Sequence, residues 1–178
     1  MRPGSALTAA LTAAAALALT ATGAPAAAGA AAPGVSPRPA HCQEKALRIS
    51  ASPGDRHHVA RIAVTNRGGR TCVVDRIPTV TFRGLDGSAQ PVPPATSGSY
   101  VLSPGERGYA AVRTAERGTR QGHVVRSLSV AADPAHYGVT FGAAAVGMDR
   151  GIRVWEPVTT LWHTSRGSAD RALAAATR

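Results

Sequence analysis

Six histidines are the residues of this chain best suited to binding a metal ion. His57 and His58 are adjacent and follow a Pro-Gly pair, so they belong to a turn or to the start of a strand. Neighbouring residues on a strand point to opposite faces, and such a pair shares one ion only within a turn. Zinc or copper would also need ligands from elsewhere in the chain. We therefore expect exposed histidines and no metal site, and we keep metal binding as an alternative function. The other four are His41, His123, His136 and His163.

Carboxylates could serve an enzyme, but no catalytic motif accompanies them. The sequence contains no Gly-x-Ser-x-Gly nucleophile motif and no His-Glu-x-x-His metalloprotease motif. Most of the acids lie in predicted turns, where Asp commonly caps backbone N–H groups. We expect no catalytic residue and no cofactor, and an enzyme with a site built from scattered residues stays an alternative. The acids are Glu44, Asp55, Asp75, Asp86, Glu106, Glu116, Asp133, Asp149, Glu156 and Asp170.

Cys42 and Cys72 are the only cysteines. A zinc site would need four ligands, commonly with short Cys-x-x-Cys spacing, and that spacing is absent. A nucleophilic thiol is not expected to have a matching second cysteine in an oxidising compartment. In an exported chain an even number of cysteines predicts a disulfide, and two cysteines allow one pairing. Closing a loop of this length would stabilise the fold by about 3–4 kcal/mol.

The start of the chain predicts export. Arg2 precedes an apolar run from Ala6 to about Ala21, and several Ala-x-Ala sites follow. This is the pattern of a secretory signal peptide, which we place at residues 1–28. The run has few large apolar residues, whereas a membrane anchor needs about 20 strongly apolar ones. No cysteine directly follows the run, so we expect neither lipid attachment nor a membrane span after cleavage.

Residues 29–41 are rich in Pro and Ala and predict an extended linker. The folded part then runs over residues 42–162, which is the length of one domain. After it, residues 163–178 could form only a short helix, which would be marginal alone, so we expect a flexible C-terminal tail. These segments together predict a secreted, extracellular protein, with the cell wall as one site of attachment.

Charge is strongly unbalanced along the chain. Lys and Arg total 20 against 10 acids, for a net charge of +10, and Lys45 is the only lysine. A solvated basic surface is the simpler explanation of this excess, and attraction to an anionic partner such as an envelope polymer is the functional alternative. Nucleic-acid binders concentrate their charge and interleave aromatic residues, so no nucleic acid is expected. The arginines are instead spread: Arg48, Arg61, Arg76, Arg83, Arg113, Arg126 and Arg153.

Alternation with period two dominates the predicted domain and indicates short strands. Residues 57–65 place Ala60, Ile62 and Val64 on one face, and residues 46–52 and 78–84 alternate in the same way. Gly68-Gly69 predicts a turn with positive φ, and Asp86-Gly87 predicts a hairpin. About eight such strands, with the disulfide, predict an all-β fold: an antiparallel, immunoglobulin-like β-sandwich.

Two tryptophans carry the only indole rings. Trp155 lies out of phase with Ile152 and Val154, so we expect it to be half-exposed. Packing in the core or at its rim is the expected role of Trp155 and Trp162. An exposed Trp beside surface arginines would instead form a patch that binds sugars or polymers.

Several short motifs resemble those of one family. Cys42 to Leu47, "VTNRGGRTCVV", "PTVTF", "DG" and "LSPGERGYAAV" are similar to a family of secreted actinobacterial domains of unknown function with paired cysteines. Ile77-Pro78-Thr79 stands where that family has a Gly-Tyr-Pro-like segment. The resemblance implies the sandwich and the disulfide, and it implies no catalytic residue. We expect a non-catalytic module that binds a protein or an anionic polymer at the cell envelope.

Overall fold

The structure is a computed structural model and describes residues 39–176 of the chain. The predicted signal peptide and most of the predicted linker lie outside the described residues. Within them the chain forms twelve strands, two 3₁₀ helices and one α-helix. The strands are β1 (Leu47–Pro53), β2 (Val59–Asn66), β3 (Cys72–Asp75), β4 (Thr79–Phe82), β5 (Gln90–Val92), β6 (Ser99–Leu102), β7 (Arg107–Arg113), β8 (His123–Val125), β9 (Ser127–Ala131), β10 (Val139–Gly142), β11 (Ile152–Val154) and β12 (Val158–Thr160). The helices are η1 (Glu44–Ala46), η2 (Ala143–Val146) and α1 (Arg166–Ala176).

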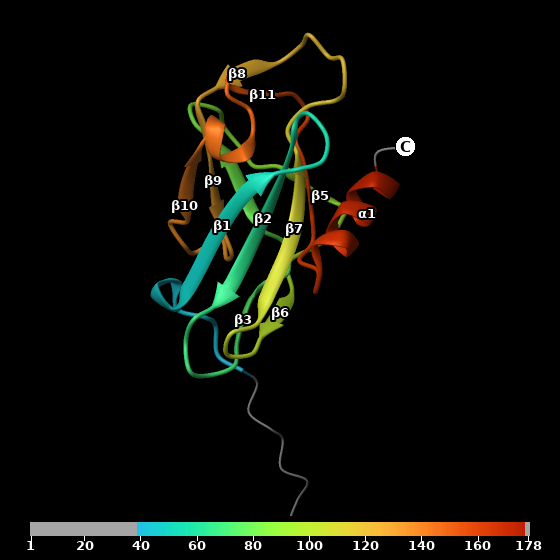
Figure 1. Ribbon diagram of the computed structural model, residues 1–178. Coiled ribbons are helices and arrows are strands. Elements are labelled where there is room, and N and C mark those ends of the chain that lie inside the picture. Colours follow the sequence, from blue (N-terminus) through green and yellow to red (C-terminus); the bar gives the residue numbers. More distant parts are fainter. Residues whose placement is uncertain (1–38, 177–178) are drawn as a thin grey trace, which may run out of the picture. The chain divides into compact units, whose positions relative to one another are not determined.

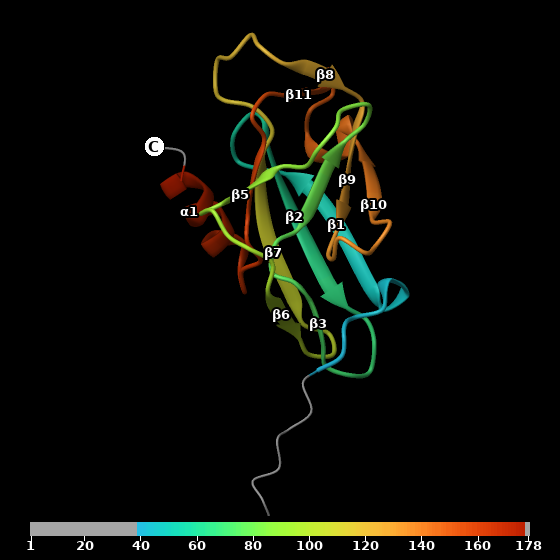
Figure 2. The same ribbon diagram turned by 180° about the vertical axis from the view of Figure 1, so that it is seen from behind.

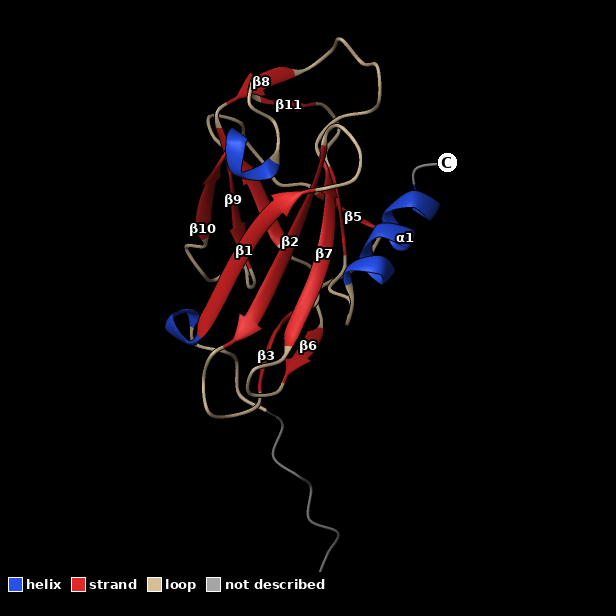
Figure 3. Cartoon of the chain, in the orientation of Figure 1, coloured by secondary structure: helices blue, strands red, loops and turns tan. Residues whose placement is uncertain are grey.

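Two sheets face each other across the core, as Figures 1 and 2 show from opposite sides. The larger sheet has the strand order β1-β2-β7-β12-β5, and the smaller has the order β10-β9-β4. The ribbons β3–β6 and β8–β11 extend the two ends of the sandwich (Figure 3). All strand pairs are antiparallel except β5 with β12. The predicted all-β antiparallel sandwich is confirmed.

The core is built by the alternation that the sequence shows. On β2, Ala60, Ile62 and Val64 are each at most 1% exposed, while the residues between Ala60 and Val64 are only partly buried. These side chains point inward because successive residues of a strand face opposite sides of the sheet. They pack with apolar residues from the opposite sheet, namely Val80, Phe82, Leu128 and Val130. Aliphatic side chains therefore fill most of the space between the layers.

A disulfide joins Cys42 to Cys72, as predicted, with 4.9 Å between the Cα atoms. It ties the chain before β1 to the first residue of β3. The backbone supports the same junction, because Cys42 N–H donates to the Val73 carbonyl at 2.8 Å and Val73 N–H donates to the Ala40 carbonyl at 2.9 Å. Cys42 is buried, so the bridge is part of the core. The N-terminal end of the domain is thus held covalently.

The turn between β2 and β3 differs from the prediction, since neither Gly68 nor Gly69 has a positive φ. Buried Asn66 organises it instead. The Asn66 side chain donates to the carbonyls of Arg70 at 2.8 Å and Leu102 at 2.9 Å, and it accepts the N–H of Gly68 at 2.8 Å. Asn commonly makes such local side-chain turns, which replace the backbone geometry that glycine would supply.

Strand number and partners also differ from the sequence prediction. Twelve strands form within the described residues where about eight were expected, because residues 123–131 and 152–160 each divide between two sheets. After Asp86-Gly87 only one bridge forms, between Thr81 and Ser88, and β5 then crosses to pair with β12. Alternation shows which face of a strand is buried, but it carries no information about which strand lies beside it.

As far as residue 176 the C-terminal segment is ordered, which corrects the flexible tail predicted at residues 163–178; residues 177 and 178 lie outside the described part of the chain. Residues 166–176 form α1, which packs on the outer face of the larger sheet beside β7, β12 and β5 (Figure 1). Its Ala169 and Leu173 are buried against Ala111 of β7. The Arg166 guanidinium lies 5.8 Å from the centre of the Tyr109 ring. A helix of this length is marginal alone, so these tertiary contacts stabilise it.

Gly122 offers a direct test of packing at the β8–β11 end. Its φ is 93°, and a Cβ added there would collide with the carbonyl oxygen of Val154. Gly118 has a similar φ of 80° but faces open space. We expect Gly118→Ala to cost about 1 kcal/mol of unfolding free energy through backbone strain, and Gly122→Ala to cost at least about 2 kcal/mol more. Urea denaturation measures both, and equal losses would contradict this packing.

Candidate functional site

A hollow of about 770 Å³ opens at one end of the larger sheet. Three segments surround it: the turn between β1 and β2, the chain around the end of β7, and the C-terminal half of α1. These segments lie on the same side of the domain in Figures 1 and 2. β2 begins and β7 ends at this point because the two strands pair antiparallel, with Val59 opposite Arg113. The lining residues are Asp55, Arg56, His57, His58, Val59, Arg113, Ala115, Arg117, Gly118, Asp170, Leu173 and Ala174.

Both carboxylates in the lining are paired with one arginine, Arg61. Its Nε donates to both carboxylate oxygens of Asp170 at 3.1 Å, and its Nη2 donates to Asp170 Oδ2 at 2.8 Å. Nη2 also donates to Asp55. The hydrogen bonds that Arg61 donates to Asp170, and then the one that it donates to Asp55, raise the pKa of Arg61. The acids of the hollow are therefore already engaged, and they fix α1 and the β1–β2 turn to β2.

Arg113 is the partly buried arginine of the hollow, since Arg56 and Arg117 are exposed. Its side chain is only 18% exposed. Nη1 donates to Glu116 at 3.4 Å, but the buried Nε makes no hydrogen bond to the described residues. A buried donor without a partner costs about 1–3 kcal/mol. A ligand oxygen that accepted this N–H, after a rotation of the Arg113 side chain that exposes Nε, would remove that cost.

His57 and His58 both line the hollow, so the turn does bring them to one place. His58 has a φ of 62°, and its carbonyl accepts the N–H of Thr114 at 2.8 Å. Burial lowers the pKa of His58 below its ordinary value of 6.5, and the nearby charges of His57 and Arg153 lower this pKa further. At neutral pH the His58 ring is therefore uncharged, and acidification adds positive charge beside Arg113.

The lowered pKa of His58 predicts a pH dependence of stability. The unfolded chain, with an ordinary histidine pKa of 6.5, binds a proton more readily than the folded chain. The contribution of His58 to the free energy of unfolding is therefore fully present above pH 6.5. It is lost as the pH falls toward the pKa that His58 has in the folded chain. Burial lowers the pKa of His163 as well, with the same sign. We expect His58→Asn, which tolerates the positive φ, to show a smaller loss of unfolding free energy between about pH 7.5 and 5 than the original chain. Equal losses would contradict the assignment to His58.

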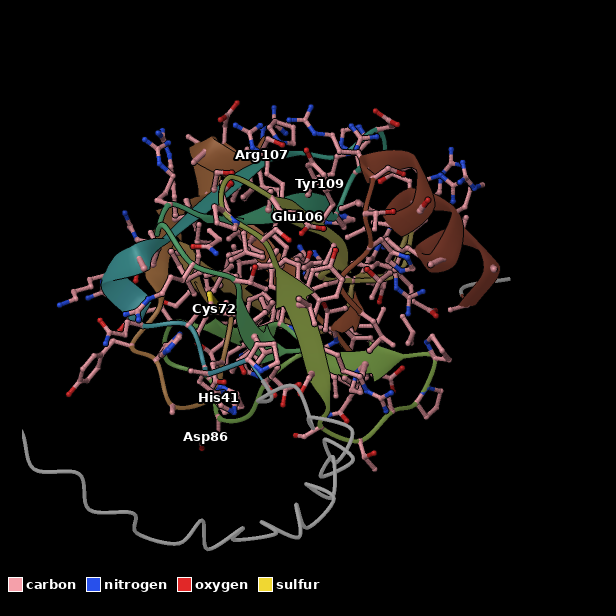
Figure 4. All side chains as sticks on the ribbon, turned by 90° about the horizontal axis from the view of Figure 1, so that it is seen from below. His41, Cys72, Asp86, Glu106, Arg107 and Tyr109 are labelled. Carbon is pink, nitrogen blue, oxygen red and sulfur yellow. A yellow bond between two sulfur atoms is a disulfide. The ribbon has the colours of Figure 1, made fainter. Side chains whose placement is uncertain are left out.

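The other histidines do not converge on the hollow. His41 Nδ1 lies 3.2 Å from Asp133 Oδ2, at the far end of the sandwich, which Figure 4 views directly. His136 has a buried Nδ1 without a hydrogen-bond partner among the described residues. His163 exchanges backbone hydrogen bonds with Tyr109. Within residues 39–176 no group of three or more His, Cys, Asp or Glu side chains could hold a metal ion.

The two tryptophans differ in exposure. Trp155 is 39% exposed, as expected, and Trp162 is buried at 5%. Trp155 follows Arg153, whose Nη1 donates to the Arg120 carbonyl at 3.2 Å. Arg107, by contrast, lies at the opposite end of β7 from Arg113 (Figure 4). The arginines therefore gather partly at the hollow, while others stay dispersed over the surface.

Sequence reasoning missed the part of the hollow that α1 supplies. The sequence predicts a tail over residues 163–178, so Asp170 is not expected to contribute to a site. One signal was available, since Ala169 and Leu173 are four residues apart and share a helix face. Their partner Ala111 lies on β7, on the face of the larger sheet that α1 covers.

The arrangement is suited to binding an anion. It combines three arginines and two histidines with two carboxylates that Arg61 already holds. In the described part of the chain, no helix is long and apolar enough to cross a membrane. A model of a family described as "Domain of unknown function (DUF4232)" matches residues 42–161, which include every strand but not α1. Comparison with curated proteins and with solved structures gives no match.

Proposed function

Because the chain belongs to the DUF4232 family of domains of unknown function, we propose its role from the hollow itself: an exported, non-catalytic module that binds an anionic group of the cell envelope. One observation carries the proposal. The buried Nε of Arg113 lacks a hydrogen-bond partner among the described residues, in a hollow whose two carboxylates are both engaged by Arg61. An anionic oxygen is the partner that such a donor prefers.

The surroundings of Arg113 support an anion rather than a neutral ligand. Arg56 and Arg117 line the same hollow from two different segments, so positive charge approaches a ligand from more than one side. Arginine suits this task because its planar fork binds phosphate or carboxylate with two hydrogen bonds. Arg113 is partly buried, so salt screens its interaction with an anion less than it screens those of the exposed Arg56 and Arg117.

Export is the second part of the proposal. The signal-peptide pattern of residues 1–28 supports it, and so does the disulfide, which persists in oxidising compartments. A cell-envelope polymer or protein with anionic groups is the partner that such a location would offer. An immunoglobulin-like topology and an actinobacterial source stay predictions of the sequence.

Retention on purified cell wall tests this function. At about 50 mM salt we expect the original chain to be retained, and at about 500 mM salt we expect it to be released, because salt screens the charges. Arg113→Gln should weaken retention at low salt about tenfold or more, which is the effect of one lost charged hydrogen bond. Arg107→Gln is the matched control, since it removes the same charge at the opposite end of β7. Equal retention of both variants would refute the hollow as the binding site.

A further inference from the structure

Beside its arginines the hollow has an apolar wall. The wall consists of Val59 from β2, Ala115 from the chain after β7, and Leu173 and Ala174 from α1. We propose, building on the proposed function, that the ligand is an amphiphilic anion: a phosphate or carboxylate head joined to an alkyl or acyl chain that lies against this wall.

The register of the sheet places the charged and apolar parts together. Arg113 and Val59 are directly paired on β7 and β2, so their side chains stand on the same face of the sheet. Both are only partly buried. A ligand that reached the Arg113 guanidinium would therefore touch the Val59 side chain. An anion without an apolar portion would leave that side chain in water.

The helix makes the apolar wall a fixed surface. Ala169 and Leu173 anchor α1 on Ala111, and Asp170 is held by Arg61. Ala174 is partly buried and contributes a small side chain to the lining. A small residue at this position leaves space beside β2 that a methylene chain can occupy. Since α1 lies outside the family-matched residues, this half of the site comes from a part of the chain that the family model does not include.

The volume of the hollow fits a ligand that is larger than a phosphate or carboxylate group alone. The hollow measures about 770 Å³, within the range of about 300–1,000 Å³ that is typical of small-molecule sites. Such sites are mostly apolar, with a few polar groups that fix the orientation of the ligand. Here Arg113, with His57 and His58 beside it, would bind the charged head of the ligand. The residues of α1 would contact its alkyl chain.

Calorimetric titration of the full chain with a series of anions tests this inference. The probes are inorganic phosphate, butyl phosphate, octyl phosphate and octanoate, each below its micelle concentration. Every methylene that leaves water contributes about a fourfold gain in affinity. We expect butyl phosphate to bind at least about tenfold more tightly than inorganic phosphate. Comparison of octyl phosphate with octanoate shows which head the arginines prefer.

Two variants test which part of the hollow contacts the alkyl chain of the ligand. Ala174→Phe fills the apolar side of the hollow and should abolish the gain from the alkyl chain, so that butyl phosphate and inorganic phosphate bind this variant with the same affinity. Ala175→Phe adds the same ring at an exposed neighbour outside the lining and should retain the gain. Equal affinity for all phosphates in the original chain would overturn the amphiphile and leave the proposed function standing. Absence of binding by every probe, or binding that Arg113→Gln does not weaken, would overturn the proposed function as well.

Discussion

Replacing both cysteines, as Cys42→Ala with Cys72→Ala, lowers the free energy of unfolding by about 3–4 kcal/mol. The bridge spans a sequence separation of 30 residues, and a loop of that size restricts the unfolded chain strongly. The loss is a large fraction of the stability of a small domain, which is commonly about 5–15 kcal/mol in total. Urea denaturation of the original chain and of the double variant measures it.

The original chain under a reducing agent serves as the control for this prediction. It should lose nearly the same free energy as the double variant, because both lack the covalent tie. A change below about 1 kcal/mol would show that the loop between the cysteines is already restricted in the unfolded chain. The disulfide would then not be the main interaction that stabilises the N-terminal end of the domain.

Introducing a charge under the helix, as Leu173→Asp, detaches α1 from the sheet. Loss of a buried leucine alone costs about 2–5 kcal/mol, and burial of an unpaired carboxylate adds to that cost. Because α1 packs on the outer face, the helix should open without unfolding the sandwich. We expect hydrogen exchange of the amides of residues 166–176 to accelerate on the order of a hundredfold, while β2 and β7 keep their protection.

Ala175→Asp is the matched control for this helix variant, since it places the same charge on the exposed side. It should leave exchange over α1 nearly unchanged. Similar acceleration in both variants would show that helix propensity, rather than the contact with Ala111, holds α1 in place. The hollow also requires α1 to stay in place, because Asp170 and Ala174 of this helix line it.

The features that local patterns determine were predicted correctly. The buried face of β2 follows from the alternation of Ala60, Ile62 and Val64. The disulfide follows from two cysteines in a chain whose sequence predicts export. Both depend on residue type and spacing alone, so the sequence contains the information directly.

The arrangement of the strands was not predictable in the same way. After β4 the chain leaves the smaller sheet, and β5 joins the larger sheet beside β12, which lies about 70 residues later in the chain. Such pairing depends on how the two layers pack and not on the residues of β5. The helix α1 was missed for a related reason: an isolated segment of this length is marginal, and its stability comes from the sheet that it covers.

The candidate site was predictable only in part. His57 and His58 were identified as a possible site, and both line the hollow. The importance of Arg113 could not be read from the sequence, because it depends on the antiparallel pairing that brings Val59 beside it. The ion pair of Arg61 with Asp170 joins residues 109 positions apart and gives no local signal.

Chemical-shift mapping with inorganic phosphate tests the central claim most directly, namely that the hollow binds an anion. The account predicts saturable amide shifts confined to residues 55–59, residues 113–118 and α1, and it predicts their loss in Arg113→Gln. Shifts that do not saturate, or that spread equally to Arg107 and the other dispersed arginines, would contradict it.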